Sequence, residues 1–163
     1  MGSCCAASGG FTVKDDDEFR TICELNPSQI RDLELLYRKE WWTNTREFKD
    51  IKTMLENSDL VIGILESATG KLVAFTRVLS DFVYKGLILD VIVAHDYRQK
   101  KLGRRLMDTI LNHPKLKAVH RFELYCLPEM APFYEKWGFV ETKKVLFMVR
   151  ESVKPGEKID ELA

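Results

Sequence analysis

Residues 90–107 read DVIVAHDYRQKKLGRRLM, and this stretch decides the fold. It begins as the end of an apolar run, Leu87 to Ala94, which is rich in the branched side chains typical of a buried strand. After a polar and basic segment, Leu102, Leu106 and Ile110 recur every four residues and form one apolar stripe, as in an amphipathic helix. The stretch therefore predicts a strand, a short loop and a helix.

The charges at the start of this helix are opposite to those that stabilise a helix. A helix N-terminus carries a partial positive charge and favours Asp or Glu in its first turn. Only Asp96 is acidic here, and the basic residues around it are Arg98, Lys100, Lys101, Arg104 and Arg105. Free backbone amides and concentrated cations make an anion site, for which phosphate is the natural occupant. The other interpretation is a solvated basic surface without a ligand.

Residues 98–103, RQKKLG, resemble the acyl-CoA pyrophosphate loop of the GNAT superfamily of N-acetyltransferases. Arg98 and Gly103 match the family pattern, and Lys101 stands where its first glycine usually lies. The resemblance implies that the cofactor is acetyl-CoA (coenzyme A). The residues expected to bind it are Val91, Ile92 and Val93 at the strand edge, then Arg98, Gln99, Lys100, Lys101, Leu102, Gly103 and Arg104.

Residues 132–139, PFYEKWGF, resemble a second signature of the same superfamily, Phe-Tyr-x-x-x-Gly-Phe, at every fixed position. The resemblance implies that Tyr134 donates a proton to the leaving thiolate, and a phenol within hydrogen-bond reach is a competent donor. The other interpretation is an aromatic helix stripe packed in the core. An Asn that commonly lies seven residues before this tyrosine is replaced by Leu127.

The rest of the chain predicts alternating strands and helices. Strands are expected at residues 19–25, 59–66, 71–79, 87–94 and 121–127, with the closing strand or strands in 139–150, and helices from Asn26 to Trp41 and at 48–55, 102–112 and 129–137. This order resembles the GNAT fold over most of the chain. The resemblance implies an α/β (α+β) single domain with a mixed, mostly antiparallel sheet, which is split between the fourth and fifth strands and flanked by about four helices.

The expected domain organisation is a flexible tail (1–17), a GNAT acetyltransferase domain (18–150) and a C-terminal tail (151–163). The pantetheine arm is expected to lie in the split of the sheet like an added strand. The start of the chain, Met1-Gly2-Ser3-Cys4-Cys5, fits either an acylation signal or a flexible tail. The tail is favoured, because Ala6 stands where the acylation signal prefers Ser or Thr.

The composition of the chain argues against a nucleic-acid-binding protein, a membrane-spanning protein and a metalloprotein. The 163 residues carry 25 basic and 25 acidic side chains, and this zero net charge argues against a nucleic-acid partner, which would need an extended basic face. No apolar run is long enough to span a membrane, and no secretory segment is recognisable, so a cytoplasmic location is expected. The four cysteines lack paired metal-ligand spacing, and no metal is predicted.

The implied reaction is direct transfer of an acetyl group from the thioester to a primary amine in a ternary complex. The amide of Val93 is the family's usual donor to the carbonyl. Asp90 is the first candidate for the general base, because it is ionisable inside an apolar strand and burial would raise its pKa. Its other interpretation is a carboxylate bonded to nearby amides, and Glu123 and Asp81 are weaker candidates for the base.

The resemblance implies an acceptor pocket around Trp41, Trp42 and Arg46, at the connection between the first two helices. The tryptophans could stack on an amine, and Arg46 could bind a carboxylate. The alternative is core packing for Trp41 and a surface position for Arg46. The sequence leaves open a small-molecule amine, an amino acid, or a protein lysine or N-terminus, and whether the chain forms a homodimer. The rival function is a non-catalytic acyl-CoA-binding GNAT-fold sensor or docking module.

Overall fold

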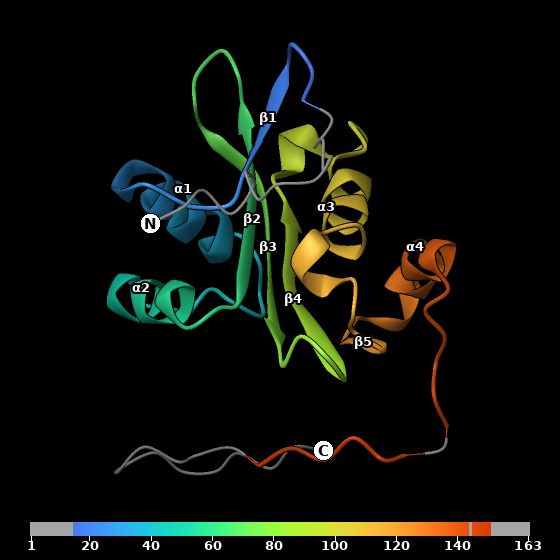
Figure 1. Cartoon of the computed structure of the whole chain (residues 1–163). Helices are drawn as coiled ribbons and strands as arrows, with labels where there is room; N and C mark the ends of the chain where they lie inside the picture. The colour runs from blue at the N-terminus through green and yellow to red at the C-terminus, as the bar shows by residue number, and fades with distance from the viewer. Residues whose placement is uncertain (1–14, 144, 151–163) are drawn as a thin grey trace, which may run out of the picture. The chain divides into compact units, whose positions relative to one another are not determined.

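The computed structural model describes residues 15–143 and 145–150, which form a mixed α/β fold (Figure 1). The strands in these residues are β1 (Phe19–Ile22), β2 (Leu60–Glu66), β3 (Leu72–Ser80), β4 (Lys85–Val93) and β5 (Arg121–Leu124). The α-helices are α1 (Pro27–Arg38), α2 (Phe48–Glu56), α3 (Leu102–Leu111) and α4 (Ala131–Tyr134). Two compact units divide between Tyr125 and Cys126, and the sheet belongs entirely to the first.

The strands of this unit form one sheet in the order β1-β2-β3-β4-β5. The first three pairs are antiparallel and β4 pairs with β5 in parallel, which confirms the predicted mixed, mostly antiparallel sheet. The parallel pairing runs only from Lys85 opposite Arg121 to Ile88 opposite Leu124. Strand β4 then continues through Leu89–Val93 without pairing to β5, so the predicted split between the fourth and fifth strands is present.

Helices cover both faces of the sheet, with α1 and α2 on one side and α3 on the other (Figure 1). Helix α1 begins where the sequence predicts, because Asn26 caps the helix and forms a reciprocal capping box with Gln29. Leu33 and Tyr37 of α1 pack in a buried cluster with Phe75 of β3. This packing holds α1 against the centre of the sheet.

A β-bulge interrupts β4 near the start of its free segment. Phe75 pairs with Ile92 and Arg77 with Leu89, so two residues of β4 lie opposite one residue of β3. Asp90 is one of the two, and its φ of 56° places it in the left-handed region. An aspartate tolerates this region better than a bulky residue does. The bulge changes the direction of the side chains just after the last residue that pairs with β5, and the Asp90 side chain reaches Tyr37 of α1.

Two predictions about elements are wrong. Residues 139–143 and 145–150 contain no strand, although they are rich in strand-forming side chains, and Leu146 is 89% exposed. Such residues form a strand only where a partner strand satisfies their backbone groups. Helix α1 ends at Arg38 and does not reach Trp41. The chain tightens there, since the amide of Lys39 bonds to the carbonyl of Leu36.

The predictions for residues 1–14 and 151–163, including the two interpretations of Met1-Gly2-Ser3-Cys4-Cys5, lie outside the described residues. Among the helices that the structure describes, none combines the length and the apolar character needed to cross a bilayer.

Candidate functional site

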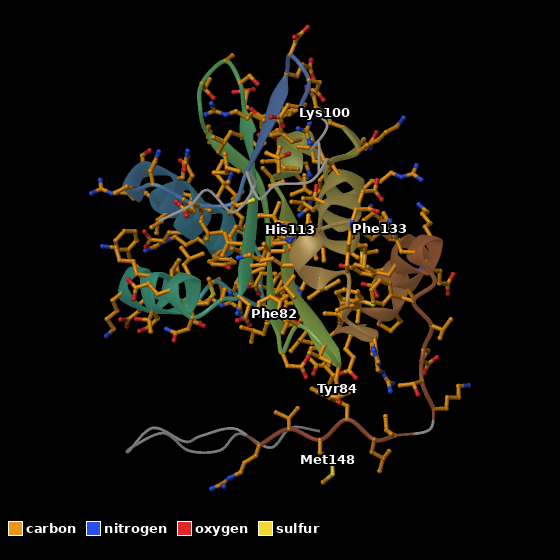
Figure 2. The ribbon with its side chains drawn as sticks, in the orientation of Figure 1. Phe82, Tyr84, Lys100, His113, Phe133 and Met148 are labelled. Carbon is orange, nitrogen blue, oxygen red and sulfur yellow. The ribbon has the colours of Figure 1, made fainter. Side chains whose placement is uncertain are left out.

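The predicted phosphate loop lies at the end of β4 opposite to the β3–β4 hairpin. Figure 2 shows Lys100 at this end of the first unit and Tyr84, from the hairpin, at the other. A short 3-10 turn (His95–Tyr97) leads from β4 into the loop, and α3 follows. The predicted order of strand, loop and helix is confirmed, with Gly103 in the first turn of α3.

The start of α3 offers free backbone amides. Its first internal hydrogen bond joins the amide of Arg105 to the carbonyl of Lys101, at 3.0 Å. The preceding amides, those of Leu102, Gly103 and Arg104, have no carbonyl one turn earlier in the helix to accept them. Such a turn, at the positive end of the helix dipole, favours an anion.

Lys101 adopts the backbone conformation that a glycine would supply at this position. Its φ is 61°, and Gln99 two residues earlier has a φ of 74°. A left-handed conformation costs a side-chain-bearing residue about 1 kcal/mol or more, and such strain is common at ligand sites. The departure from the family pattern at Lys101 therefore leaves the loop conformation intact and adds a positive charge.

The cations of the loop divide into two groups. Arg105 lies against the acidic turn before β1, where it bonds to Asp15 at 2.7 Å and to Asp16 at 3.1 Å. Lys100 lies 3.4 Å from Glu18 of the same turn. These two side chains are therefore partly neutralised within the protein.

Arg98 also has a carboxylate partner, since it lies 2.6 Å from Glu40 in the connection between α1 and α2. Arg104 is exposed, and its nearest ion-pair partner among the described residues is Asp108 at a long 3.9 Å. Lys101 forms no ion pair within 4.0 Å with a residue that the structure describes. Lys101 and Arg104 are therefore the best placed of the predicted basic residues to bind a phosphate.

We expect the double variant Lys101→Asn, Arg104→Gln to weaken coenzyme A binding by about tenfold, because two charge-assisted contacts would be lost. Asparagine tolerates the left-handed conformation of residue 101, so the loop should keep its shape. Titration calorimetry with coenzyme A and with pantetheine measures the effect, and Lys117→Gln, at an exposed site elsewhere, is the control. Equal losses for pantetheine, which lacks the phosphates, would place the diphosphate elsewhere.

The free segment of β4 supplies the other half of the predicted cofactor site. Ile92 is buried in the cluster beneath α1, whereas Val91 and Val93 are only partly buried. On one side this segment pairs with β3, and the amide of Ala94 still reaches the carbonyl of Val73 at 2.8 Å. On the other side no described strand pairs with it beyond Ile88. An extended ligand with amide groups can bind to such an edge as an added strand.

Asp90 is buried and lies at the centre of a hydrogen-bonded cluster. Its carboxylate accepts two bonds from Arg46, at 2.8 and 3.0 Å, and one from Nε of Arg77 at 2.6 Å. The hydroxyl of Tyr37 donates a further bond at 2.9 Å. The Asp90 side chain is only 3% exposed.

The expectation that the pKa of Asp90 is raised is wrong. Burial does push the pKa upward, but hydrogen bonds from Arg46 and Arg77 outweigh it and hold the pKa below the ordinary value for an aspartate. Burial, and after it the charge of the same carboxylate, raise the pKa of the Tyr37 phenol far above its ordinary range. Asp90 is therefore charged at neutral pH and is a weaker base than the sequence analysis expected.

The three predicted acceptor residues do not have the positions of the alternative interpretation, which placed Trp41 in the core and Arg46 at the surface. Trp41 is 69% exposed, so it does not pack in the core. Trp42 is 41% exposed. Arg46 is only 29% exposed, and its guanidinium lies over the ring of Tyr37, 4.6 Å from the centroid. The structure thus brings Arg46 to Asp90 and leaves two aromatic side chains accessible next to it along the chain.

Tyr134 lies in the second unit, at the end of α4, and its side chain is buried. Its ring contacts Phe133 and Phe139 edge-on, with centroids 4.9 and 6.3 Å away. Burial, with a smaller effect of Cys126, raises the pKa of Tyr134 to about 12. The phenol is therefore protonated at neutral pH, as a proton donor must be. Tyr134 therefore packs with its aromatic neighbours, as the second interpretation predicts. Its role as the proton donor to the thiolate stays a prediction.

Sequence reasoning missed two members of these clusters, namely Tyr37 and Arg77. Arg77 had a usable signal, because it is a lone charge inside the apolar strand β3, as Asp90 is in β4. Opposite charges in neighbouring apolar strands tend to pair. Tyr37 gave no comparable signal, because it also fits the apolar stripe of α1. Among the described residues, no group of three or more His, Cys, Asp or Glu side chains is arranged to hold a metal ion.

The sequence is similar to those of known N-acetyltransferases. A sequence profile described as "Acetyltransferase (GNAT) domain" matches residues 57–141. The chain is 28% identical over 131 residues to an uncharacterised N-acetyltransferase, ycf52, of Pyropia yezoensis, and the match covers 78% of this chain and 75% of that one. It is 33% identical over 88 residues to glucosamine 6-phosphate N-acetyltransferase 1 of Oryza sativa subsp. japonica, covering 50% and 53% of the two chains.

The fold is similar to the crystal structure of a protein assigned to the GNAT acetyltransferases from Xanthomonas campestris pv. campestris. The TM-score is 0.69, and the likeness covers 81% of this chain and 93% of that one. At 22% identity this likeness concerns the fold alone.

Proposed function

This chain belongs to the GNAT acetyltransferase family, and on that premise we propose that it transfers an acetyl group directly from acetyl-CoA to a primary amine. The observation that carries the proposal is the adjacency of two features, the unpaired segment of β4 and the free amides at the start of α3. The first suits the amide-bearing pantetheine arm, and the second suits a diphosphate. The residues present therefore fit the cofactor that the family uses.

The proposed roles follow from the chemistry of each group. Acetyl-CoA, when bound, supplies an activated thioester. The amides of Leu102, Gly103 and Arg104, with the Lys101 side chain, hold the diphosphate. The Val93 amide donates to the carbonyl as negative charge develops on its oxygen. Tyr134 holds the proton that the leaving thiolate takes up, a role assigned from the family signature at residues 132–139.

The amine must lose a proton before it can attack, because an alkylammonium has a pKa of about 10. Two acceptors for this proton are proposed, namely Asp90 and a water relay. The relay is favoured, because the guanidinium groups of Arg46 and Arg77 hold the Asp90 carboxylate as an anion.

The acceptor is proposed to lie beside the connection between α1 and α2, near Trp41, Trp42 and Arg46. One relative's name specifies glucosamine 6-phosphate, so this amino sugar phosphate belongs in any acceptor panel beside free amino acids and peptides. The catalytic domain is proposed to lie within residues 18–150, as a monomer or homodimer. A cytoplasmic location is proposed from the sequence, with the chloroplast as the alternative because one relative is named as chloroplastic.

We expect millimolar acetyl-CoA to raise the melting temperature of the full chain, because a ligand that binds only the folded state stabilises it by about 2.7 kcal/mol at a hundred times its dissociation constant. Differential scanning fluorimetry measures this shift, and adenosine 3′,5′-bisphosphate tests the nucleotide half alone. The absence of a shift with acetyl-CoA would contradict both the enzyme and the rival acyl-CoA-binding module.

A further inference from the structure

We propose that Asp90 is a positioning residue, which holds the connection between α1 and α2 against β4 through Arg46. The connection comprises residues 39–47 and carries Trp41 and Trp42. We call this contact between Asp90 and Arg46 the anchor. It would hold residues 39–47 in place whether or not the protein is an acetyltransferase. Its effect on acceptor binding rests on the proposed function.

Four donors surround the Asp90 carboxylate. A carboxylate offers about four lone-pair sites, and here two N–H groups of Arg46, one of Arg77 and the Tyr37 hydroxyl supply four donors. Three of these bonds converge on Oδ2. A group in this state is suited to holding its neighbours and leaves little room for a proton from an incoming amine.

Arg46 is itself fixed by three kinds of contact. Both of its terminal nitrogens bond to Asp90, its guanidinium lies over the Tyr37 ring, and its backbone amide bonds to the carbonyl of Thr43 at 3.1 Å. A bidentate arginine–carboxylate pair defines direction as well as distance. Arg46 therefore fixes the end of the connection that leads into α2.

The middle of the connection is fixed by Thr43. Its side chain is buried, and its hydroxyl donates to the carbonyl of Tyr37 at 2.9 Å. Trp41 and Trp42 lie between this point and the end of α1, and both are exposed. Their positions therefore depend on the anchored backbone around them, because their own side chains are not held in the core.

Asp90 also has a special place in β4. It lies in the bulge near the start of the free segment, which ends at Val93. One carboxylate therefore links the strand proposed to bind the donor with the connection proposed to bind the acceptor. Arg77, which is 12% exposed, completes the link from β3.

Hydrogen–deuterium exchange of the full chain tests the anchor without any substrate. The variants are Asp90→Asn and Arg46→Gln, and asparagine keeps both the shape of the side chain and a tolerance for the left-handed conformation. The matched control is Arg105→Gln, which also breaks two ion pairs but contacts the turn before β1 and Phe19 and Thr21 of β1, away from residues 39–47. Residues 102–111 of α3 serve as the internal reference in every sample.

We expect amide exchange in residues 39–47 to become about tenfold faster in Asp90→Asn and Arg46→Gln, measured relative to α3, and to stay unchanged in Arg105→Gln. In Arg46→Lys, the exchange rate of residues 39–47 should lie between those of Arg46→Gln and Arg105→Gln, because lysine keeps the charge and loses the bidentate geometry. Equal acceleration in residues 39–47 and α3, or no acceleration, would overturn the anchor. These exchange rates can be measured even if the protein has no transferase activity.

Kinetics adds a second readout once an acceptor is known. Arg46→Gln should raise KM for the acceptor about tenfold and change KM for acetyl-CoA less than about twofold, because the connection borders the acceptor only. A raised acceptor KM with unchanged exchange would overturn the anchor in favour of a direct contact between Arg46 and the acceptor. Loss of kcat in Asp90→Asn with unchanged exchange would overturn it in favour of a general base.

Discussion

Replacing Tyr134 with phenylalanine should lower kcat by about a hundredfold, which is the lower end of the range for a general acid. The variant removes one hydroxyl and keeps the ring that contacts Phe133 and Phe139. Without a proton donor, the thiolate must leave as an anion, and the step becomes slower. Steady-state assays of free thiol release, at saturating acceptor and with varied acetyl-CoA, measure the change.

The dissociation constant for acetyl-CoA should change much less than kcat in Tyr134→Phe, because proton donation matters only as the bond breaks. Tyr84→Phe is the matched control, since Tyr84 is exposed on the β3–β4 hairpin at the end of β4 opposite to the phosphate loop (Figure 2). With a pKa of about 12, Tyr134 should not limit activity at mildly alkaline pH. Unchanged kcat in Tyr134→Phe would exclude the acid role.

Asp90→Asn should lower the free energy of unfolding at neutral pH by about 3 kcal/mol, because breaking a buried ion pair leaves its partner charge uncompensated. Here Arg46 and Arg77 would both lose their carboxylate. Urea denaturation followed by circular dichroism measures the difference. Asp96→Asn is the control, since Asp96 is exposed and should change stability by less than about 0.5 kcal/mol.

The pH dependence of this loss has a definite sign. The pKa of Asp90 is lower in the folded state than in the unfolded chain, so its contribution is present in full above the unfolded pKa. It is lost as the pH falls through the folded pKa. The gap between the wild type and Asp90→Asn should therefore be constant from pH 6 to 8 and narrow below about pH 4. A gap that widens in acid would contradict the ion-pair account.

Much of the fold could be predicted from local pattern. The strand ending at Val93 and the helix beginning at Leu102 follow from apolar periodicity, and Asn26 marks the start of α1. The closing strand in 139–150 could not be predicted in this way, because strand propensity does not state whether a partner strand is present. The end of α1 at Arg38 was missed for a similar reason, since Trp41 matches the helical spacing and the interactions of Thr43 do not appear in the sequence.

The candidate site was predictable where it consists of neighbours in sequence, and less so where it depends on contacts across the fold. The basic helix start and the conformation needed at Lys101 are local features. The acidic partners of Arg98 and Arg46, in contrast, lie far away in the sequence. Glu40 lies 58 positions before its partner Arg98, and Arg46 lies 44 positions before Asp90. The direction of the Asp90 pKa shift depends on that second contact, so burial alone gave the wrong sign.

The central claim is that the chain uses acetyl-CoA to acetylate an amine. The most direct measurement incubates the full-length protein with acetyl-CoA labelled with ¹³C in the acetyl group and a panel of amines, followed by mass spectrometry and a thiol assay. The panel comprises glucosamine 6-phosphate, free amino acids, alkyl amines and peptides with free lysines or N-termini. We predict one labelled N-acetyl product for each coenzyme A released with at least one amine, and loss of both signals in Tyr134→Phe. Stable binding of acetyl-CoA without a labelled product from any amine would contradict the claim and leave a binding module.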